Sequence, residues 1–287
     1  MIQIQRWAMI ALCAWGVSFA ALPAEAREPE KKPMLLFAHR GGSFEFDENT
    51  MEAFRGSYEK GLRGFETDVR MTKDGAFVIL HDDTLERTHD GKGHVEQQTA
   101  ESLRNVKSKK GNPLLFLDDL LDYFADKPGV YLEFEMKTSN KNLYPDDRLE
   151  EYCRKLLDAI RAKRPEGSDY VLTSFDERPL RIVRSLDADA DLLLITGGPC
   201  DAKIVERAKD IGVQRIGCRM DGTSRASVRA AHEAGLIVTG WPGHTLEDYH
   251  LAVGLGVDAF CSDIPVATRA WRERQTSATG SAPAETP

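Results

Sequence analysis

The chain has 287 residues, which is enough to bury a sizeable core and fits one large α/β domain. Its composition, 41% hydrophobic and 29% charged, is ordinary for a globular protein. The formal net charge of −8 argues against a general nucleic-acid-binding protein, because that affinity depends on Lys and Arg neutralising many phosphates. It does not exclude a small phosphorylated ligand, for which only the local field in the site matters.

The first residues indicate an export signal and not a part of the fold. Arg6 precedes the apolar run Trp7–Leu22, and Ala24-Glu25-Ala26 has the small-x-small pattern of a signal-peptidase site. We therefore predict that residues 1–26 are a signal peptide, cleaved after Ala26, and that the protein is periplasmic or secreted. An uncleaved membrane anchor is the alternative; the run has 16 residues, whereas a bilayer span needs roughly 20.

Strand-like and helix-like runs alternate over residues 27–271, which we predict to be a single catalytic domain. Helical patterns such as Asp147–Arg164 and Ser224–Ala234 separate the strands, and this alternation favours a parallel sheet with right-handed crossovers. The strand candidates in chain order are Met34–His39, Phe65–Arg70, Val130–Lys137, Tyr170–Phe175, Asp191–Thr196, Gln214–Arg219, Leu236–Trp241 and Asp258–Ser262.

One further run, Ala76–Asp82, follows the second strand after only Thr72-Lys73-Asp74-Gly75. A parallel crossover needs a dozen or more residues, so this run is expected to form an antiparallel hairpin arm. The remaining eight strands predict a TIM (β/α)8 barrel. A doubly wound open sheet is the alternative, but no glycine-rich phosphate loop follows the first strand.

Three segments outside the strands also carry expectations. The polar stretch His89–Asn112 indicates a loop excursion after the second strand, with a short helix around Ala100–Val106. Residues 272–287 are rich in Ser, Thr, Ala and Pro, and we expect a disordered tail. The cysteines after the signal do not form a CxxC pair, and burial is the simplest expectation, although export would permit one disulfide. These cysteines are Cys153, Cys200, Cys218 and Cys261.

Ionisable residues gather where the predicted strands end, which is where TIM barrels carry their sites. Glu66 and Asp68 are two residues apart and share one face of their strand, as do Glu133, Glu135 and Lys137 on the next. Burying such charges without partners is costly. Oxygen ligands from Glu66, Asp68 and Glu135 would suit one divalent cation, Ca²⁺ or Mg²⁺. Solvated charges at strand edges are the alternative, but they explain the convergence of several strands poorly.

An ordered set of short motifs resembles the metal-dependent glycerophosphodiester phosphodiesterase family. Each motif is weak alone, but their order is specific, and the resemblance runs from about Leu35 to Ala270. The motifs are His39-Arg40-Gly41, Glu48-Asn49-Thr50, Glu66-x-Asp68, Thr72-Lys73-Asp74-Gly75, His81-Asp82, Arg87-Thr88, Glu135-x-Lys137, Gly256-Val257-Asp258 and Ser262-Asp263-x-Pro265.

The resemblance implies a role for each matching residue and an activity for the protein. His39 and His81 are similar to the catalytic histidines of the family. Glu66, Asp68 and Glu135 resemble its metal ligands, and Arg40 and Lys137 its phosphate contacts. The implied reaction is metal-dependent hydrolysis of small glycerophosphodiesters to glycerol 3-phosphate and an alcohol, by water or by a substrate hydroxyl. A phospholipase D-like or lysophospholipase D-like enzyme and an inactive binding barrel remain alternatives.

Several residues carry a second interpretation. Trp241 is expected to stack against the substrate and otherwise to pack in the barrel wall. Thr50 is expected to cap a helix, and Phe175 to line the wall. We treat the remaining histidines as surface or structural residues; these are His89, His94, His232 and His250.

The chain departs from the family pattern after Trp241. The family usually shows Thr-Val-Asn there, whereas this chain has Pro242-Gly243-His244. His244 thus stands where an amide is usual. His89 likewise follows Arg87-Thr88 where a small polar residue is usual. Both departures bear on the substrate preference and leave the catalytic set intact.

Overall fold

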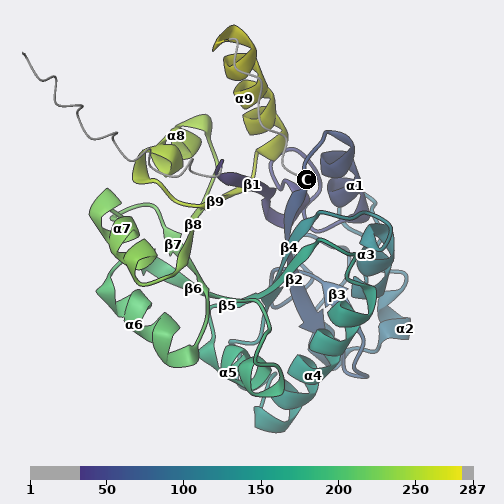
Figure 1. The fold of residues 1–287 in the computed structure, drawn as a ribbon. Coiled ribbons are helices and arrows are strands. Elements are labelled where there is room, and N and C mark those ends of the chain that lie inside the picture. Colours follow the sequence, from purple (N-terminus) through teal and green to yellow (C-terminus); the bar gives the residue numbers. More distant parts are fainter. Residues whose placement is uncertain (1–32, 280–287) are drawn as a thin grey trace, which may run out of the picture. The chain divides into compact units, whose positions relative to one another are not determined.

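A ring of parallel strands forms the centre of residues 33–279, which are the residues that the computed structural model describes (Figure 1). Strand β2 shows why these segments are strands: all eight of its residues are buried, as expected for a strand covered on both faces. The parallel strands are β1 (Leu35–Ala38), β2 (Gly64–Met71), β4 (Tyr131–Met136), β5 (Asp169–Ser174), β6 (Leu192–Pro199), β7 (Arg215–Arg219), β8 (Ile237–Trp241) and β9 (Ala259–Ser262).

Strand β1 closes the ring, because it pairs in parallel with both β2 and β9. Ala38 lies opposite Phe65 on one side and opposite Ser262 on the other. The eight parallel strands therefore make a closed barrel. The predicted TIM barrel is confirmed, and the open doubly wound sheet is excluded.

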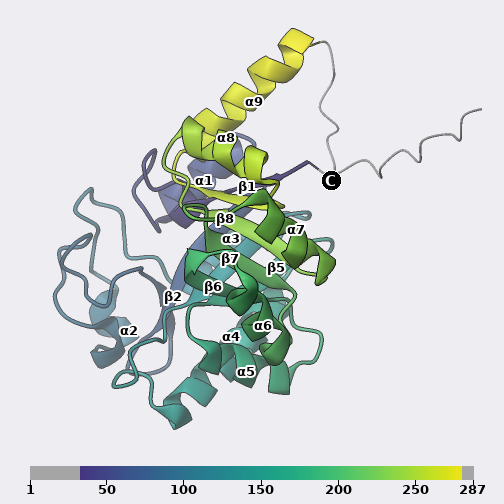
Figure 2. The same cartoon turned by 90° about the vertical axis from the view of Figure 1, so that its left-hand side faces the viewer.

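Strand β3 (Phe77–Ile79) pairs antiparallel with β2, so the predicted hairpin arm is also confirmed. The excursion that follows carries the short helices η2 (Val95–Gln97) and α2 (Ala100–Leu103) and stands beside the barrel (Figure 2). It has a hydrophobic cluster of its own, which explains why a polar segment holds a fixed shape. The buried members are Val78, Leu80, Leu85, Val95, Leu103, Leu114 and Phe116.

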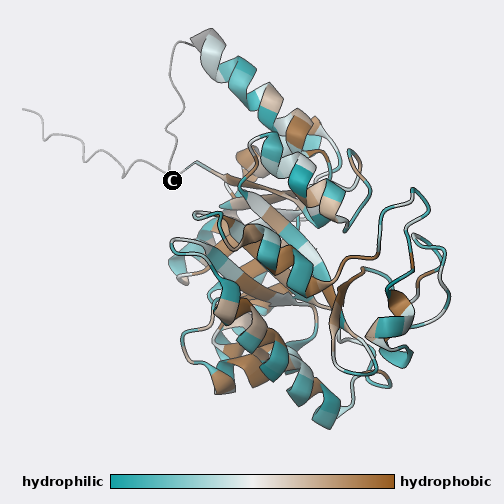
Figure 3. Cartoon of the chain, turned by 90° about the vertical axis from the view of Figure 1, so that its right-hand side faces the viewer, coloured by the Kyte–Doolittle hydropathy of each residue, from teal (hydrophilic) through white to brown (hydrophobic). Residues whose placement is uncertain are grey.

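Helices surround the barrel, and Figure 3 shows that apolar and polar residues are mixed along them. Most of the helix residues that are buried are apolar. In α4 the buried residues recur at helical spacing, from Leu149 to Ile160. Thr50 caps α1, since its side chain accepts a hydrogen bond from the amide of Ala53, and the predicted capping role is confirmed. The helices are α1 (Met51–Glu59), α3 (Leu117–Phe124), α4 (Asp146–Lys163), α5 (Glu177–Leu186), α6 (Ala202–Ile211), α7 (Arg225–Glu233), α8 (Leu246–Leu255) and α9 (Pro265–Thr279).

The predicted disordered tail is wrong for residues 272–279, because α9 continues to Thr279. Trp271 packs against Tyr249, with 5.7 Å between the ring centroids, and Arg269 forms an i,i+4 ion pair of 2.8 Å with Glu273. Both contacts favour the helical form over a solvated chain. Residues 280–287 lie outside the described part.

The remaining whole-chain expectations have different outcomes. The four cysteines that follow the predicted signal peptide are all buried, as expected, and none of them forms a disulfide. The predicted signal peptide, residues 1–26, lies outside the described residues and stays a prediction. Within residues 33–279, no helix is both long enough and apolar enough to cross a bilayer.

Candidate active site

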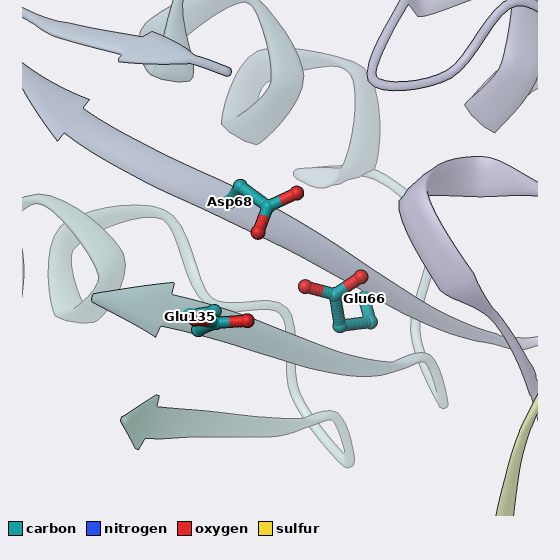
Figure 4. Close-up of side chains that lie close together, drawn as sticks. All are labelled: Glu66, Asp68 and Glu135. Atoms are coloured by element: carbon teal, nitrogen blue, oxygen red, sulfur yellow. The ribbon is translucent and has the colours of Figure 1, made fainter. Parts of the chain in front are cut away.

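Three buried carboxylates meet on strands β2 and β4, just beyond the level at which β1 ends beside Phe65. Glu66 and Asp68 share the inner face of β2, and Glu135 lies directly opposite Asp68 in the pairing of β2 with β4. One ligand oxygen from each carboxylate lies within 4.8 Å of the other two. Figure 4 shows the three groups facing one another. The structure therefore brings together all three residues that the sequence assigned to a metal.

The electrostatics of this cluster suit a bound cation. Burial, together with the charges of Asp68 and Glu135, raises the pKa of Glu66 well above its usual value. Glu66 Oε1 and Asp68 Oδ1 are buried and have no hydrogen-bond partner among the described residues. Buried carboxylate oxygens without hydrogen bonds are costly, and so is the repulsion between neighbouring carboxylates. A hard divalent cation would remove both costs, so the residues fit Ca²⁺ or Mg²⁺.

Two cationic side chains border the cluster. Lys137 Nζ lies 2.8 Å from Glu135 Oε1 and 3.6 Å from Asp68 Oδ1, while Arg40 Nε lies 3.5 Å from Asp68 Oδ2. Burial alone would raise the pKa of Asp68, but Lys137 and Arg40 outweigh it and keep that pKa below its usual value. The predicted role of these two side chains as phosphate contacts stays a prediction.

The turn after β1 aims Arg40 at the cluster. Arg40 has a left-handed backbone with a φ of 52°, which costs a non-glycine residue about 1–2 kcal/mol. Its amide donates to Glu66 Oε2 at 3.0 Å, and Gly41 follows with a φ of 79°. A Cβ on Gly41 would lie 2.7 Å from the Cβ of Ala53, so only glycine lets this turn close against α1.

The two predicted catalytic histidines each bond to an aspartate. His39 Nδ1 lies 2.6 Å from Asp263 Oδ1, and His81 Nδ1 lies 2.7 Å from Asp82 Oδ1. A carboxylate at Nδ1 selects the tautomer that carries its proton there, which leaves the lone pair on Nε2. His39 Nε2 lies 3.8 Å from Glu66 Oε2, so this imidazole borders the carboxylate cluster directly.

Arg87 links the two histidine loops across the site. Its guanidinium donates to Asp82, the partner of His81, and to both oxygens of Glu48, at 2.8 and 2.7 Å. Glu48 in turn accepts a hydrogen bond of 3.1 Å from Arg40. The pair of arginines therefore ties the His81 loop to the segment that follows His39. The sequence motifs contained Glu48 and Arg87 but did not give them this role.

Arg70 fixes the loop that carries His81 and was missed as a site residue. This buried side chain donates to the carbonyl oxygens of Leu80, at 3.1 Å, and His81, at 2.7 Å. It also bonds Asp83 at 2.8 Å and Glu96 at 3.0 Å. The available signal was its position two residues after Asp68, on the same face of β2.

Trp241 lies at the end of β8, partly exposed. Its ring meets Phe175 edge-on with 5.8 Å between centroids, and the guanidinium of Arg219 lies 5.3 Å from the ring. Its buried Nε1 has no hydrogen-bond partner among the described residues. An indole N–H of this kind can donate to a ligand. The substrate contact of Trp241 stays a prediction.

The other histidines have partners away from the carboxylate cluster. His89 is buried and bonds Thr88 at 2.8 Å, and His232 bonds Asp258 at 2.8 Å. His94 bonds the carbonyl of Asp83 at 2.8 Å, and His250 packs on Trp271. These contacts agree with the surface or structural roles that we expected.

Asp263 gives the protein a specific sensitivity to acid. Burial alone would raise the pKa of Asp263, but hydrogen bonds from His39, Ser43 and His244 lower this pKa from 3.8 to about 2. A depressed pKa stabilises the folded state above pH 4, and this contribution is lost as the pH falls toward 2. We expect a loss of about 2 kcal/mol in the free energy of unfolding over this window. Urea titrations at successive pH values measure it.

The Asp263→Asn variant is the reference for that measurement. It cannot ionise at this position, so its free energy of unfolding is expected to fall less steeply between pH 4 and pH 2 than that of the wild type. Identical slopes for the two proteins would contradict the assignment.

The fold and the site together define a TIM-barrel protein whose charged cluster lies where enzymes of this fold carry their active sites. Residues 39–267 match the model of the Glycerophosphoryl diester phosphodiesterase family, and the chain belongs to that family. The resemblance seen in the motifs is thus confirmed.

Two relatives and one solved structure illustrate the similarity. The chain is 34% identical over 159 residues to the glycerophosphodiester phosphodiesterase of Caldanaerobacter subterraneus subsp. tengcongensis, covering 53% of this chain and 62% of that protein. It therefore spans less than two thirds of this relative's length. It is 25% identical over 245 residues to the glycerophosphodiester phosphodiesterase of Bacillus altitudinis, covering 80% and 94% of the two chains.

The solved structure is an Oleispira antarctica phosphodiesterase in complex with the product sn-glycerol-3-phosphate. It superposes with a TM-score of 0.76 at 20% identity and covers 84% of this chain and 97% of that one. At this identity the similarity shows the shared fold.

Proposed function

We propose that this protein is a metal-dependent phosphodiesterase that hydrolyses glycerophosphodiesters to glycerol 3-phosphate and an alcohol. The observation that carries the proposal is the buried cluster of Glu66, Asp68 and Glu135, flanked by His39 and His81. Family membership supports the reaction class. The product named for the Oleispira antarctica phosphodiesterase supports the identity of the phosphorylated product.

The three carboxylates would hold the cation, Ca²⁺ or Mg²⁺, through oxygen ligands. When bound, such an ion supplies positive charge that stabilises the increasing negative charge of the phosphoryl oxygens in the transition state. Arg40 and Lys137 add to this effect, because they are positioned beside Asp68 before substrate arrives.

The two histidines are suited to opposite proton transfers. Burial lowers the pKa of His81, although Asp68 opposes this effect, and a lowered pKa favours the neutral imidazole, which is the form that accepts a proton from the attacking oxygen. His39, held by Asp263 beside Glu66, would in its doubly protonated form donate the Nε2 proton to the leaving alkoxide and remain as the neutral imidazole with its proton on Nδ1. Transfers of this kind typically contribute 10²–10⁴-fold to the rate.

The direct test of the substrate is product release from glycerophosphocholine by the mature protein. Glycerol 3-phosphate and choline are expected in equal amounts. Choline phosphate in place of free choline would show that the other ester bond is cleaved and would contradict the proposal.

A lysophospholipase D-like activity is the second candidate, because two exposed aromatic side chains lie at the end of the barrel that carries the site. Phe44, 65% exposed, follows β1, and Phe175, 40% exposed, follows β5. Both could contact an acyl chain. Comparing kcat/KM for glycerophosphocholine and lysophosphatidylcholine decides between the two; the proposed function requires the higher value for the deacylated diester.

An inactive binding barrel is the remaining alternative. It would bind glycerophosphodiesters without turnover in the presence of Ca²⁺ or Mg²⁺. The paired histidines and their aspartate partners argue against it, since binding alone does not require imidazoles held in one tautomer.

Substrate stacking on Trp241 predicts a moderate effect on binding. We expect Trp241→Ala to raise KM roughly two- to twelve-fold with a smaller change in kcat, because an aromatic contact contributes about 0.5–1.5 kcal/mol. Steady-state kinetics measure the change. Trp271→Ala, which removes an indole from α9 instead, is the matched control; equal KM values for the two variants would show that Trp241 only packs in the wall.

We also propose that the protein is exported and cleaved after Ala26. The support is the order of residues in this segment: a positively charged residue, then an apolar run, then a pair of small residues at the cleavage position. Mass spectrometry of the protein from the producing cell tests it; an intact N-terminus in the mature protein would contradict the proposal.

A further inference from the structure

Asp263 is the meeting point of three side chains. Its Oδ1 receives hydrogen bonds from His39 Nδ1 at 2.6 Å and from the hydroxyl of Ser43, and its Oδ2 receives one from His244 Nδ1. The Asp263 side chain is only 3% exposed, and its backbone carbonyl accepts the amide of Phe44 at 3.0 Å. One buried carboxylate therefore joins His39 to a second imidazole.

His244 is held on its other sides as well. Its ring stacks on that of Phe44, with 5.2 Å between centroids and 12° between the planes. Its amide donates to Asp248 Oδ2 at 2.9 Å. The His244 side chain is 48% exposed, so it lies between the buried Asp263 and solvent. The imidazole thus covers the carboxylate and bonds to it at the same time.

We propose that His244 is a positioning residue that acts through Asp263 on His39. A carboxylate with a donor on each oxygen is restrained from rotating, and exclusion of water strengthens its hydrogen bond to His39 Nδ1. His39 Nε2 is thereby held beside Glu66. The inference rests on the proposed catalytic role of His39.

Donation to Asp263 Oδ2 is the property that the proposal requires. The His244 imidazole supplies this donor and adds a ring that stacks on Phe44. The side-chain amide of asparagine also carries N–H donors, whereas leucine has none. Asparagine is therefore the conservative replacement and leucine the disruptive one.

The test compares His244→Leu and His244→Asn in steady-state kinetics with glycerophosphocholine. We expect the leucine variant to lose roughly ten-fold in kcat with KM within about two-fold of the wild type, as for other residues that orient an active-site imidazole. The asparagine variant should recover most of this loss. A role in packing alone would leave kcat unchanged or would not distinguish leucine from asparagine, and either result would overturn the proposal.

Two further variants separate the causes of failure. His232 also bonds an aspartate, Asp258, at 2.8 Å, but it lies away from the carboxylate cluster. The His232→Leu variant should therefore have the kcat of the wild type. His39→Ala should be nearly inactive. Should His39→Ala retain turnover, the proposed function of His39 is wrong; should it be inactive while His244→Leu keeps full kcat, only the inference about His244 is wrong.

His244→Ala covers the case in which His244→Leu does not fold, because alanine also has no side-chain donor for Asp263 Oδ2. We expect the same loss of roughly ten-fold in kcat, with KM within about two-fold of the wild type. An unchanged kcat would overturn the proposal in that case.

Discussion

The Asp68→Asn variant is expected to lose its divalent cation and about 10³-fold in kcat, because the ion supplies several kcal/mol of transition-state stabilisation. Asp68 is buried in the centre of the cluster, with Glu135 directly opposite it in the neighbouring strand. Asn49 Nδ2 donates to Asp68 Oδ2 at 2.7 Å. In the variant this contact would hold the amide oxygen and turn the amide nitrogen, which cannot bind a cation, toward the cluster.

Glu133→Gln is the matched control for that experiment. Glu133 lies on the same face of β4, two residues before Glu135, but it accepts a hydrogen bond from the hydroxyl of Tyr131, and burial raises its pKa to about 7. Glu133 does not belong to the group of three carboxylates that could share a cation, so we do not expect it to be a metal ligand. Isothermal titration with Ca²⁺ and Mg²⁺ should show binding to the wild type and Glu133→Gln and no binding to Asp68→Asn. Equal binding to all three proteins would place the cation elsewhere.

The His81→Ala variant is expected to lose roughly 10²–10⁴-fold in kcat, with a much smaller change in KM, because it removes a proton acceptor and no ligand of the cation. The structure supports this role through the bond of His81 Nδ1 to Asp82 and through Arg70, which fixes the loop. Steady-state kinetics with glycerophosphocholine measure both constants.

His250→Ala is the control for this second prediction, because His250 packs on Trp271 in α9. Its kcat should match that of the wild type. A His81→Ala protein that binds metal normally and keeps its kcat would contradict general base catalysis by His81 and would leave the carboxylates as the main catalytic element.

The barrel could be predicted because its strands follow local rules. Buried parallel strands give apolar runs separated by helical patterns, and the short Thr72–Gly75 connection permitted only a hairpin. The period of two along a strand is sufficient to put Glu66 and Asp68 on one face. These side chains face Glu135 because β2 pairs with β4. Consecutive parallel strands of a TIM barrel are neighbours, so the predicted fold also predicted this pairing.

The aspartate partner of His39 could not be assigned from a local pattern, unlike Asp82, which directly follows His81. Asp263 is 224 residues from His39 along the chain, and only closure of the barrel between β1 and β9 brings them together. The roles of Arg70 and Arg87 were missed for a similar reason, because each residue acts through hydrogen bonds to other loops. The continuation of α9 through residues 272–279 was missed because composition alone does not reveal contacts such as the packing of Trp271 on Tyr249.

The central claim is that the cluster of Glu66, Asp68 and Glu135 makes this barrel a metal-dependent glycerophosphodiester phosphodiesterase. The most direct measurement is glycerol 3-phosphate release from glycerophosphocholine by the purified protein, treated with EDTA and then given Ca²⁺ or Mg²⁺. The account predicts that release stops with EDTA and returns with one of these ions. Full release in EDTA, or no release from folded protein with either ion, would contradict it.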